Sequence, residues 1–202
     1  MVRSQKAIAS GRFPAEILER IETDLDKTLV NLHLFQNGSP LRADLHELIC
    51  AWVVYRSDTA QGYVRPLLPS RTPADDQASY INLLAAMFLL SSPPATAFLS
   101  LINLLSRPVL RAFYTETQDE IDAFYRVFEN LQADMFPKIF ANCKNLGLKV
   151  PESWFRSVLV EQVPFEAACR LWDQVSFHYR SSVTGLKDRL FWMGMGTFSV
   201  RH

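Results

Sequence analysis

The chain has few glycines, few strand signals and no net charge. Its seven glycines form no hairpin pairs, and no segment alternates apolar and polar residues for long, so a β-structure is not expected. Lys plus Arg at 21 equals Asp plus Glu at 21. This balance gives no reason to expect nucleic acid or an anionic membrane as a partner of the whole chain.

Cysteine is also scarce. Cys50, Cys143 and Cys169 are odd in number, far apart and set among apolar or helical residues. That pattern is typical of buried thiols in a reducing compartment rather than of a disulfide framework. The start, MVRSQKAIASGRFPAE, has no apolar run long enough for a signal peptide, so a cytoplasmic location is expected.

The motifs of a self-contained enzyme are missing too. There is no Gly-rich phosphate loop, no G-x-S-x-G turn and no Cys/His pair that suggests a nucleophile. The histidines have no carboxylate or cysteine at metal-ligand spacing and are expected to be exposed or singly hydrogen-bonded; they are His33, His46, His178 and His202. We therefore expect no metal and no cofactor of the chain's own.

The longest apolar run is interrupted. Residues 80–90 and 95–105 are largely apolar, but Ser91-Ser92-Pro93-Pro94 separates them. A helix across a bilayer needs about 20 uninterrupted apolar residues, and prolines in its middle would free backbone groups in lipid. The run predicts two buried helices joined by a tight turn, and no transmembrane segment.

What the chain does contain is helical periodicity. Helices are expected at 15–28, 41–55, 80–90, 95–105, 116–135 and from 164 onward, and hydrophobic residues at 49% supply a core. The helix at 41–55 has one apolar face, made of Leu45, Leu48, Ile49, Trp52 and Val53. An aromatic stripe in 116–135 is expected to be core; its members are Ile121, Phe124, Tyr125, Phe128 and Leu131. The fold class is all-α, with about seven to nine helices in a single domain.

Five blocks in order resemble the TBC-domain family of Rab GTPase-activating proteins. IETDLDKTLVNLHLFQNGSP at 21–40 is similar to the family's I-x-x-D-x-x-R-T segment, and LHELICAWVVYRSD at 45–58 to the helix after it. The other blocks are residues 79–114, FPKIFANCKNLGLKVPES at 136–153, and PFEAACRLWD at 164–173, with its Arg170-x-Trp172-Asp173 element. The similarity covers residues 15–180 and implies a multi-helix Rab-GAP TBC-like domain over 1–202.

The resemblance implies a mechanism in trans. Family members bind a GTP-loaded Rab and insert an arginine and a glutamine, while GTP and Mg²⁺ belong to the GTPase. The arginine position is Lys27 here, which keeps the charge but lacks the planar fork; the alternative is a solvated lysine at a helix end. Gln77 fits the glutamine position better than Gln61, because removing residues 65–76 leaves Gly62-Tyr63-Val64 followed by Gln77. A solvated loop glutamine is the alternative for both.

Other departures concern completeness. The proline-rich insertion RPLLPSRTPADD at 65–76 is expected to be a mobile surface loop. After Asp173 the family's closing helices are not recognisable, so the domain is expected to be incomplete at its C-terminal end, with 191–196 frayed.

The sequence leaves three hypotheses open. The first is a Rab GTPase-activating protein in vesicle trafficking, weak or active through Lys27 and a glutamine, and peripheral to endomembranes through its partner. The second is a catalytically inactive TBC-like scaffold that binds a Rab or another trafficking protein. The third is an all-α interaction domain without a Rab link, which rests on composition alone.

Overall fold

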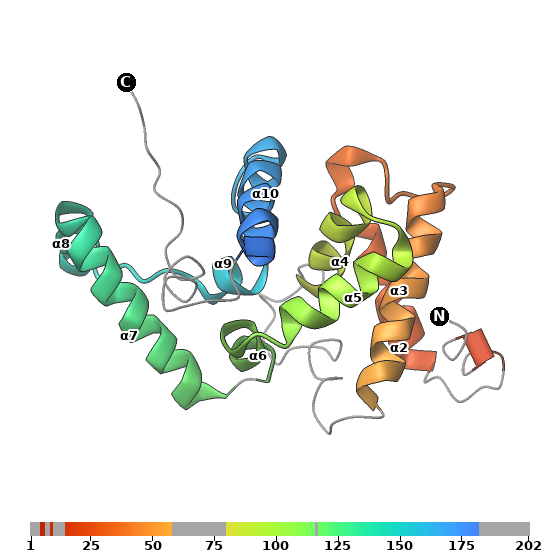
Figure 1. The fold of residues 1–202 in the computed structure, drawn as a ribbon, viewed down its shortest axis with the longest axis horizontal. Coiled ribbons are helices and arrows are strands. Elements are labelled where there is room, and N and C mark those ends of the chain that lie inside the picture. The colour runs from red at the N-terminus through yellow and green to blue at the C-terminus, as the bar shows by residue number, and fades with distance from the viewer. Residues whose placement is uncertain (1–4, 7–8, 10–14, 58–79, 116, 182–202) are drawn as a thin grey trace. The chain divides into compact units, whose positions relative to one another are not determined.

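The protein is all-α over the residues that the computed structural model describes, which are 5–6, 9, 15–57, 80–115 and 117–181 (Figure 1). The chain divides into two compact units, residues 1–115 with 156–158, and residues 116–155 with 159–202. The expectation of one domain over 1–202 stays a prediction, and each unit is described by itself.

The first unit contains one short 3₁₀ turn and five α-helices in its described part. They are α2 (Ala15–Asp26), the 3₁₀ turn η1 (Val30–Leu32), α3 (Pro40–Ser57), α4 (Tyr80–Ser91), α5 (Pro94–Leu105) and α6 (Pro108–Thr115). Helix α3 packs against α2, α4 and α5, and α5 also packs against α6. The predicted apolar face of α3 is confirmed, since all five of its members are buried.

Helix α4 lies deepest in this unit. Eight of its residues are buried, which explains why its sequence is apolar on all sides rather than on one stripe. The predicted break follows at once: Ser92 Oγ donates to the carbonyl of Phe88 at 3.1 Å, and Pro94 stands at the start of α5, where its missing N–H costs nothing. The amide of Asn82 is also buried, and among the described residues neither of its polar atoms has a hydrogen-bond partner.

Helix α6 was not predicted as a separate element, because Pro108 was not used as a helix start. A short return of the chain completes this unit. The hydroxyl of Tyr114 in α6 donates to the carbonyl of Arg156 at 2.9 Å, and Ser157 is fully buried. Residues 156–158 are therefore part of the first unit, although they follow its last helix by more than forty positions in the chain.

The second unit contains α7 (Gln118–Met135), α8 (Pro137–Asn145), most of α9 (Glu152–Arg156) and α10 (Phe165–Ser181). Helices α7 and α8 pack against each other. The aromatic-stripe prediction was right only in part: Ile121 and Phe128 are buried, whereas Phe124, Tyr125 and Leu131 are half-buried.

The half-buried aromatics still have defined partners. The rings of Tyr125 and Phe128 both meet Phe155 edge to face, with centroids 5.3 and 5.5 Å away. The hydroxyl of Tyr125 reaches the carbonyl of Val150 at 2.9 Å. A half-buried tyrosine is thus explained by its polar end, which must reach a hydrogen-bond acceptor while the ring packs.

The cysteine expectation was also right in part. All three cysteines are free thiols, but only Cys50 is buried, whereas Cys143 and Cys169 are half-buried. Both half-buried thiols lie on helices, Cys143 on α8 and Cys169 on α10. Helical context alone therefore does not place a cysteine in the core.

Candidate functional site

The site begins at the C-terminal end of α2, where the structure places Lys27. Buried side chains at four-residue intervals, Ile17, Ile21 and Leu25, hold this helix to its unit. Helix α2 ends at Asp26, two residues earlier than expected. Lys27 is half-buried in the turn that follows, and its N–H donates to the carbonyl of Asp24 at 3.2 Å.

The side chain of Thr28 closes the same helix end. Its Oγ1 donates to the carbonyl of Asp24 at 2.7 Å, and the residue is fully buried. The carboxylate of Asp24 is also fully buried, with Arg20 Nε 3.3 Å from its Oδ1. Asp24 and Thr28, the two polar residues around Lys27 in the I-x-x-D-x-x-K-T segment, are therefore structural: they fix the turn that contains the lysine.

The backbone after Lys27 is strained at two positions. Leu29 has φ 44° and His33 has φ 55°, both left-handed conformations that non-glycine residues rarely adopt. Each costs about 1–3 kcal/mol, and such residues cluster where a backbone must hold a special shape. Val30, the first residue of η1, and Leu34, directly after His33, are exposed at 51% and 44%. Lys27 and these two exposed apolar residues thus lie within eight positions of one another in the chain.

Arg42, in the first turn of α3, holds this turn from the other side. Its Nη2 lies 2.9 Å from Glu22 Oε2 and 2.8 Å from Asp26 Oδ1. Its Nη1 also donates to the carbonyl of Phe35 at 3.4 Å. Phe35 itself is fully buried. One guanidinium therefore joins the end of α2, the end of the turn and the start of α3.

We expect Arg42→Ala to lower the free energy of unfolding by about 1–2 kcal/mol. Charge-assisted hydrogen bonds are worth about 1.5–3 kcal/mol, but both carboxylates are more than half exposed, which discounts the value. Urea unfolding measures the loss, which should shrink in about 1 M NaCl. The matched control is Arg126→Ala at an exposed position of α7; an equal loss in both variants would contradict the role of Arg42.

Helix α3 also carries a histidine–cysteine pair that was not predicted from the sequence. Cys50 Sγ lies 3.8 Å from His46 Nε2, and the same nitrogen lies 3.3 Å from Glu22 Oε1. The four-residue spacing of His46 and Cys50 on one helix face was the available signal. The order carboxylate, imidazole, thiol resembles that of a nucleophilic site.

The electrostatics of this pair argue against a nucleophile. Burial, with the nearby carboxylates of Glu22 and Glu47, raises the pKa of the Cys50 thiol to about 12. Nucleophilic cysteines need a thiolate, which is favoured by exposure and by neighbouring cations. At neutral pH the Cys50 side chain is therefore a protonated, inert thiol. A Cys/His pair does exist on α3, but the raised pKa of its thiol argues against a nucleophile there.

The other two predicted site residues, Gln61 and Gln77, lie outside the described residues, as do the insertion 65–76 and the segment 191–196. The structure therefore does not test whether either glutamine comes near Lys27. Across the described ranges there is no group of three His, Cys, Asp or Glu side chains that could hold a metal ion. Nor does any helix in those ranges have the length and apolar character needed to cross a bilayer.

Comparison with known proteins decides the family. The model of the Rab-GTPase-TBC domain matches residues 74–189, more than half of the chain. The chain belongs to this family. The matched range contains Gln77, whereas Lys27 and Gln61 precede it.

Curated relatives of this TBC-family chain agree with the assignment. TBC1 domain family member 14 of Homo sapiens is 30% identical over 160 residues, which cover 77% of this chain and 21% of the relative. TBC1 domain family member 12 of Rattus norvegicus is 29% identical over 160 residues, with the same coverage. Drainin of Dictyostelium discoideum is 28% identical over 172 residues, covering 81% of this chain and 36% of Drainin.

The chain therefore spans about a fifth of the length of the TBC1 relatives that it matches. The all-α fold expected from the resemblance is confirmed. The partner of this chain, and whether it accelerates GTP hydrolysis, are matters for a proposal.

Proposed function

We propose that this chain is a GTPase-activating protein for a Rab-family small GTPase and supplies Lys27 and a glutamine in trans. The observation that carries the proposal is the turn after α2: a cation follows a fixed helix end, beside a strained segment with exposed Val30 and Leu34. Because the chain belongs to the Rab-GTPase-TBC family, the partner proposed for this turn is a Rab GTPase.

The chemistry asked of Lys27 is electrostatic. Phosphoryl transfer spreads negative charge over the oxygens of the transferred group, and an arginine that meets this charge in trans is worth about 10³–10⁵ in rate. Lysine is a compact charge without the bidentate fork, so weaker acceleration is expected. Gln77, or Gln61 in the alternative, would orient the attacking water. GTP and Mg²⁺ are held by the GTPase.

The exposed apolar side chains support binding before chemistry. Val30 begins the 3₁₀ turn and Leu34 follows it, and both would offer the GTPase an apolar contact close to Lys27 in the chain. Apolar anchors beside charged groups are typical of protein interfaces. The proposal extends to vesicle trafficking and intracellular protein transport, at the cytoplasmic side of endomembranes.

Single-turnover GTP hydrolysis by a panel of purified Rabs tests the proposal. The 202-residue chain should accelerate hydrolysis by one or a few of them well above the intrinsic rate of about 10⁻⁴ s⁻¹ that is typical of small GTPases. A chain that binds GTP-loaded Rab without acceleration would instead be the scaffold. A chain that neither binds nor accelerates would overturn both.

A further inference from the structure

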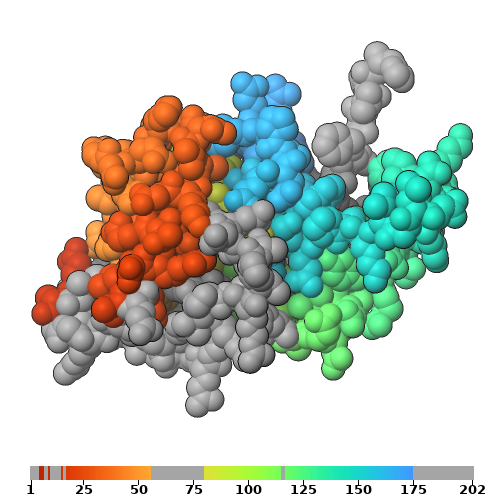
Figure 2. Space-filling view, turned by 180° about the vertical axis from the view of Figure 1, so that it is seen from behind, coloured from red at the N-terminus to blue at the C-terminus, as the bar shows by residue number. Residues whose placement is uncertain are grey.

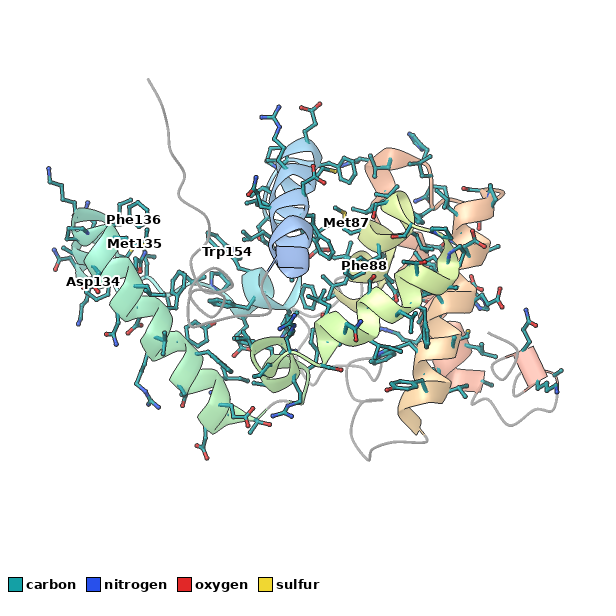
Figure 3. The ribbon with its side chains drawn as sticks, in the orientation of Figure 1. Met87, Phe88, Asp134, Met135, Phe136 and Trp154 are labelled. Atoms are coloured by element: carbon teal, nitrogen blue, oxygen red, sulfur yellow. The ribbon has the colours of Figure 1, made fainter. Side chains whose placement is uncertain are left out.

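In the second unit, large apolar side chains are exposed from the junction of α7 and α8 to the turn after α8. Figure 3 labels Asp134, Met135 and Phe136 where α7 gives way to α8. Four side chains here are at least half exposed: Met135 at 50%, Ile139 at 55%, Leu146 at 71% and Leu148 at 60%. We call this region, residues 135–149, the α8 tip.

Two of the four apolar side chains are related by helical spacing. Ile139 in α8 and Leu146 at the end of that helix are seven residues apart, so they fall on one side of it. Met135 is the last residue of α7 and is separated from α8 by the non-helical Phe136. Gly147, with φ 64°, then reverses the chain. Its N–H donates to the carbonyl of Lys144 at 3.2 Å, and that of Leu148 to the carbonyl of Cys143 at 2.9 Å.

These two hydrogen bonds form a Schellman motif, which ends a helix in a defined geometry. In that motif the residue after the glycine commonly packs back on the helix, yet Leu148 is largely exposed. The leucines on either side of Gly147 are therefore presented outward by an ordered helix end. Figure 2 shows the teal residues of this region on the face that is in view.

Basic residues border the apolar side chains. Lys138, Lys144 and Lys149 are all exposed, and residues 135–149 contain no Asp or Glu, although exposed Asp134 directly precedes them. The whole chain has no net charge, so this concentration of positive charge is local. Lys144 Nζ also lies 5.3 Å from the centre of the Phe140 ring, so its charge lies over a ring of the same helix.

We propose that the α8 tip is a docking surface for an anionic lipid membrane, into whose headgroup region Leu146 and Leu148 insert. Apolar side chains bordered by lysines are the pattern of interfacial segments, whose binding adds apolar burial to attraction by anionic lipids. Each lysine near such a surface strengthens binding by about fivefold, equivalent to about 1 kcal/mol. The charge favours a lipid surface over an uncharged apolar partner.

This inference does not depend on catalysis. It would, however, place the chain at the surface where a membrane-bound GTPase resides, by a contact of its own rather than through that partner. The local positive charge of the α8 tip does not appear in the net charge of the whole chain, because acidic residues elsewhere in the chain cancel these lysines.

Co-sedimentation of the full chain with vesicles tests the proposal. One vesicle set is phosphatidylcholine alone and the other contains about a quarter phosphatidylserine, enough for a negative surface potential. We expect binding to the second set, weakened in about 0.5 M NaCl. Leu146→Asp with Leu148→Asp should reduce it at least about tenfold, since each change replaces apolar insertion by repulsion.

Two further variants sharpen the outcome. Leu99→Asp on α5 is the matched control, because Leu99 has the same 60% exposure as Leu148 and should leave binding unchanged. Alanine at Lys138, Lys144 and Lys149 together should reduce binding by about 100-fold, from about fivefold for each. All substituted positions are exposed, so the helical circular dichroism should be retained.

Several results would overturn the proposal. They are an absence of binding to both vesicle sets, equal binding to both, or binding unaffected by either set of tip variants. A fourth is a concentration-dependent dimer in light scattering that the Leu146→Asp/Leu148→Asp variant abolishes, since that would make a second copy of the chain the occupant of the tip.

Discussion

Replacing Lys27 by alanine is expected to lower the acceleration of Rab GTP hydrolysis by about 100-fold or more. Removing one positioned donor that faces developing charge costs about 10²–10³ in rate in other enzymes, and an arginine finger is worth about 10³–10⁵. A lysine held at a fixed helix end should lie toward the lower of these ranges. Single-turnover hydrolysis with the responsive Rab measures the effect.

The converse substitution makes the test sharper. Lys27→Arg restores a planar fork that can meet two oxygens at once, so it should raise the acceleration about tenfold or more toward that of an arginine finger. Lys6→Ala, at an exposed position, is the control and should change nothing. If Lys27→Ala and Lys27→Arg both behave like the unmodified chain, then Lys27 is the solvated lysine of the alternative interpretation.

Retained Rab binding separates a catalytic loss from unfolding. The carbonyl of Asp24 accepts hydrogen bonds from the N–H of Lys27 and from Thr28 Oγ1. Neither bond needs the side chain of Lys27, so the turn should survive a change there. A variant that binds the GTP-loaded Rab normally and fails only in hydrolysis has lost a transition-state interaction. Loss of both would point to the turn itself, including Val30 and Leu34.

Elements of the fold with strong local signals could be predicted from sequence. Helix α3 was found from apolar spacing, and the break between α4 and α5 from Ser91-Ser92-Pro93-Pro94, because both depend on residues close in the chain. The burial of Phe124 and Leu131 was overestimated. Their exposure depends on what α7 packs against, and periodicity alone does not contain that information.

The site was less predictable than the fold. The position of Lys27 followed from the resemblance, but the end of α2 at Asp26 and the strained φ angles of Leu29 and His33 had no sequence signal. Neither position carries the glycine that such angles favour. The role of Arg42 was missed because its partners lie sixteen and twenty residues away on another helix. Tertiary contacts of this kind are set by packing, not by local pattern.

Trp52→Ala is expected to have the largest effect on stability. Trp52 is fully buried in α3, the helix that packs against α2, α4 and α5. Truncating a buried tryptophan to alanine costs about 3–5 kcal/mol, from lost transfer free energy and the cavity left behind. A domain is stable by only about 5–15 kcal/mol. The melting temperature of the first unit should fall by more than about 10 °C.

A conservative substitution at the same position separates packing from polarity. The indole Nε1 of Trp52 is buried and has no hydrogen-bond partner among the described residues, so Trp52→Phe removes an unsatisfied donor together with part of the ring. Removing the unsatisfied donor offsets part of the packing energy that is lost with the smaller ring. Trp52→Phe should therefore lower the free energy of unfolding by only about 1–2 kcal/mol. If thermal unfolding showed equal losses for Trp52→Phe and Trp52→Ala, ring volume would not be what Trp52 contributes. Helix α3 also carries Arg42 at its start, and Arg42 binds the end of α2. Loss of stability in Trp52→Ala should therefore loosen the turn that contains Lys27, and Rab binding should fall together with the free energy of unfolding.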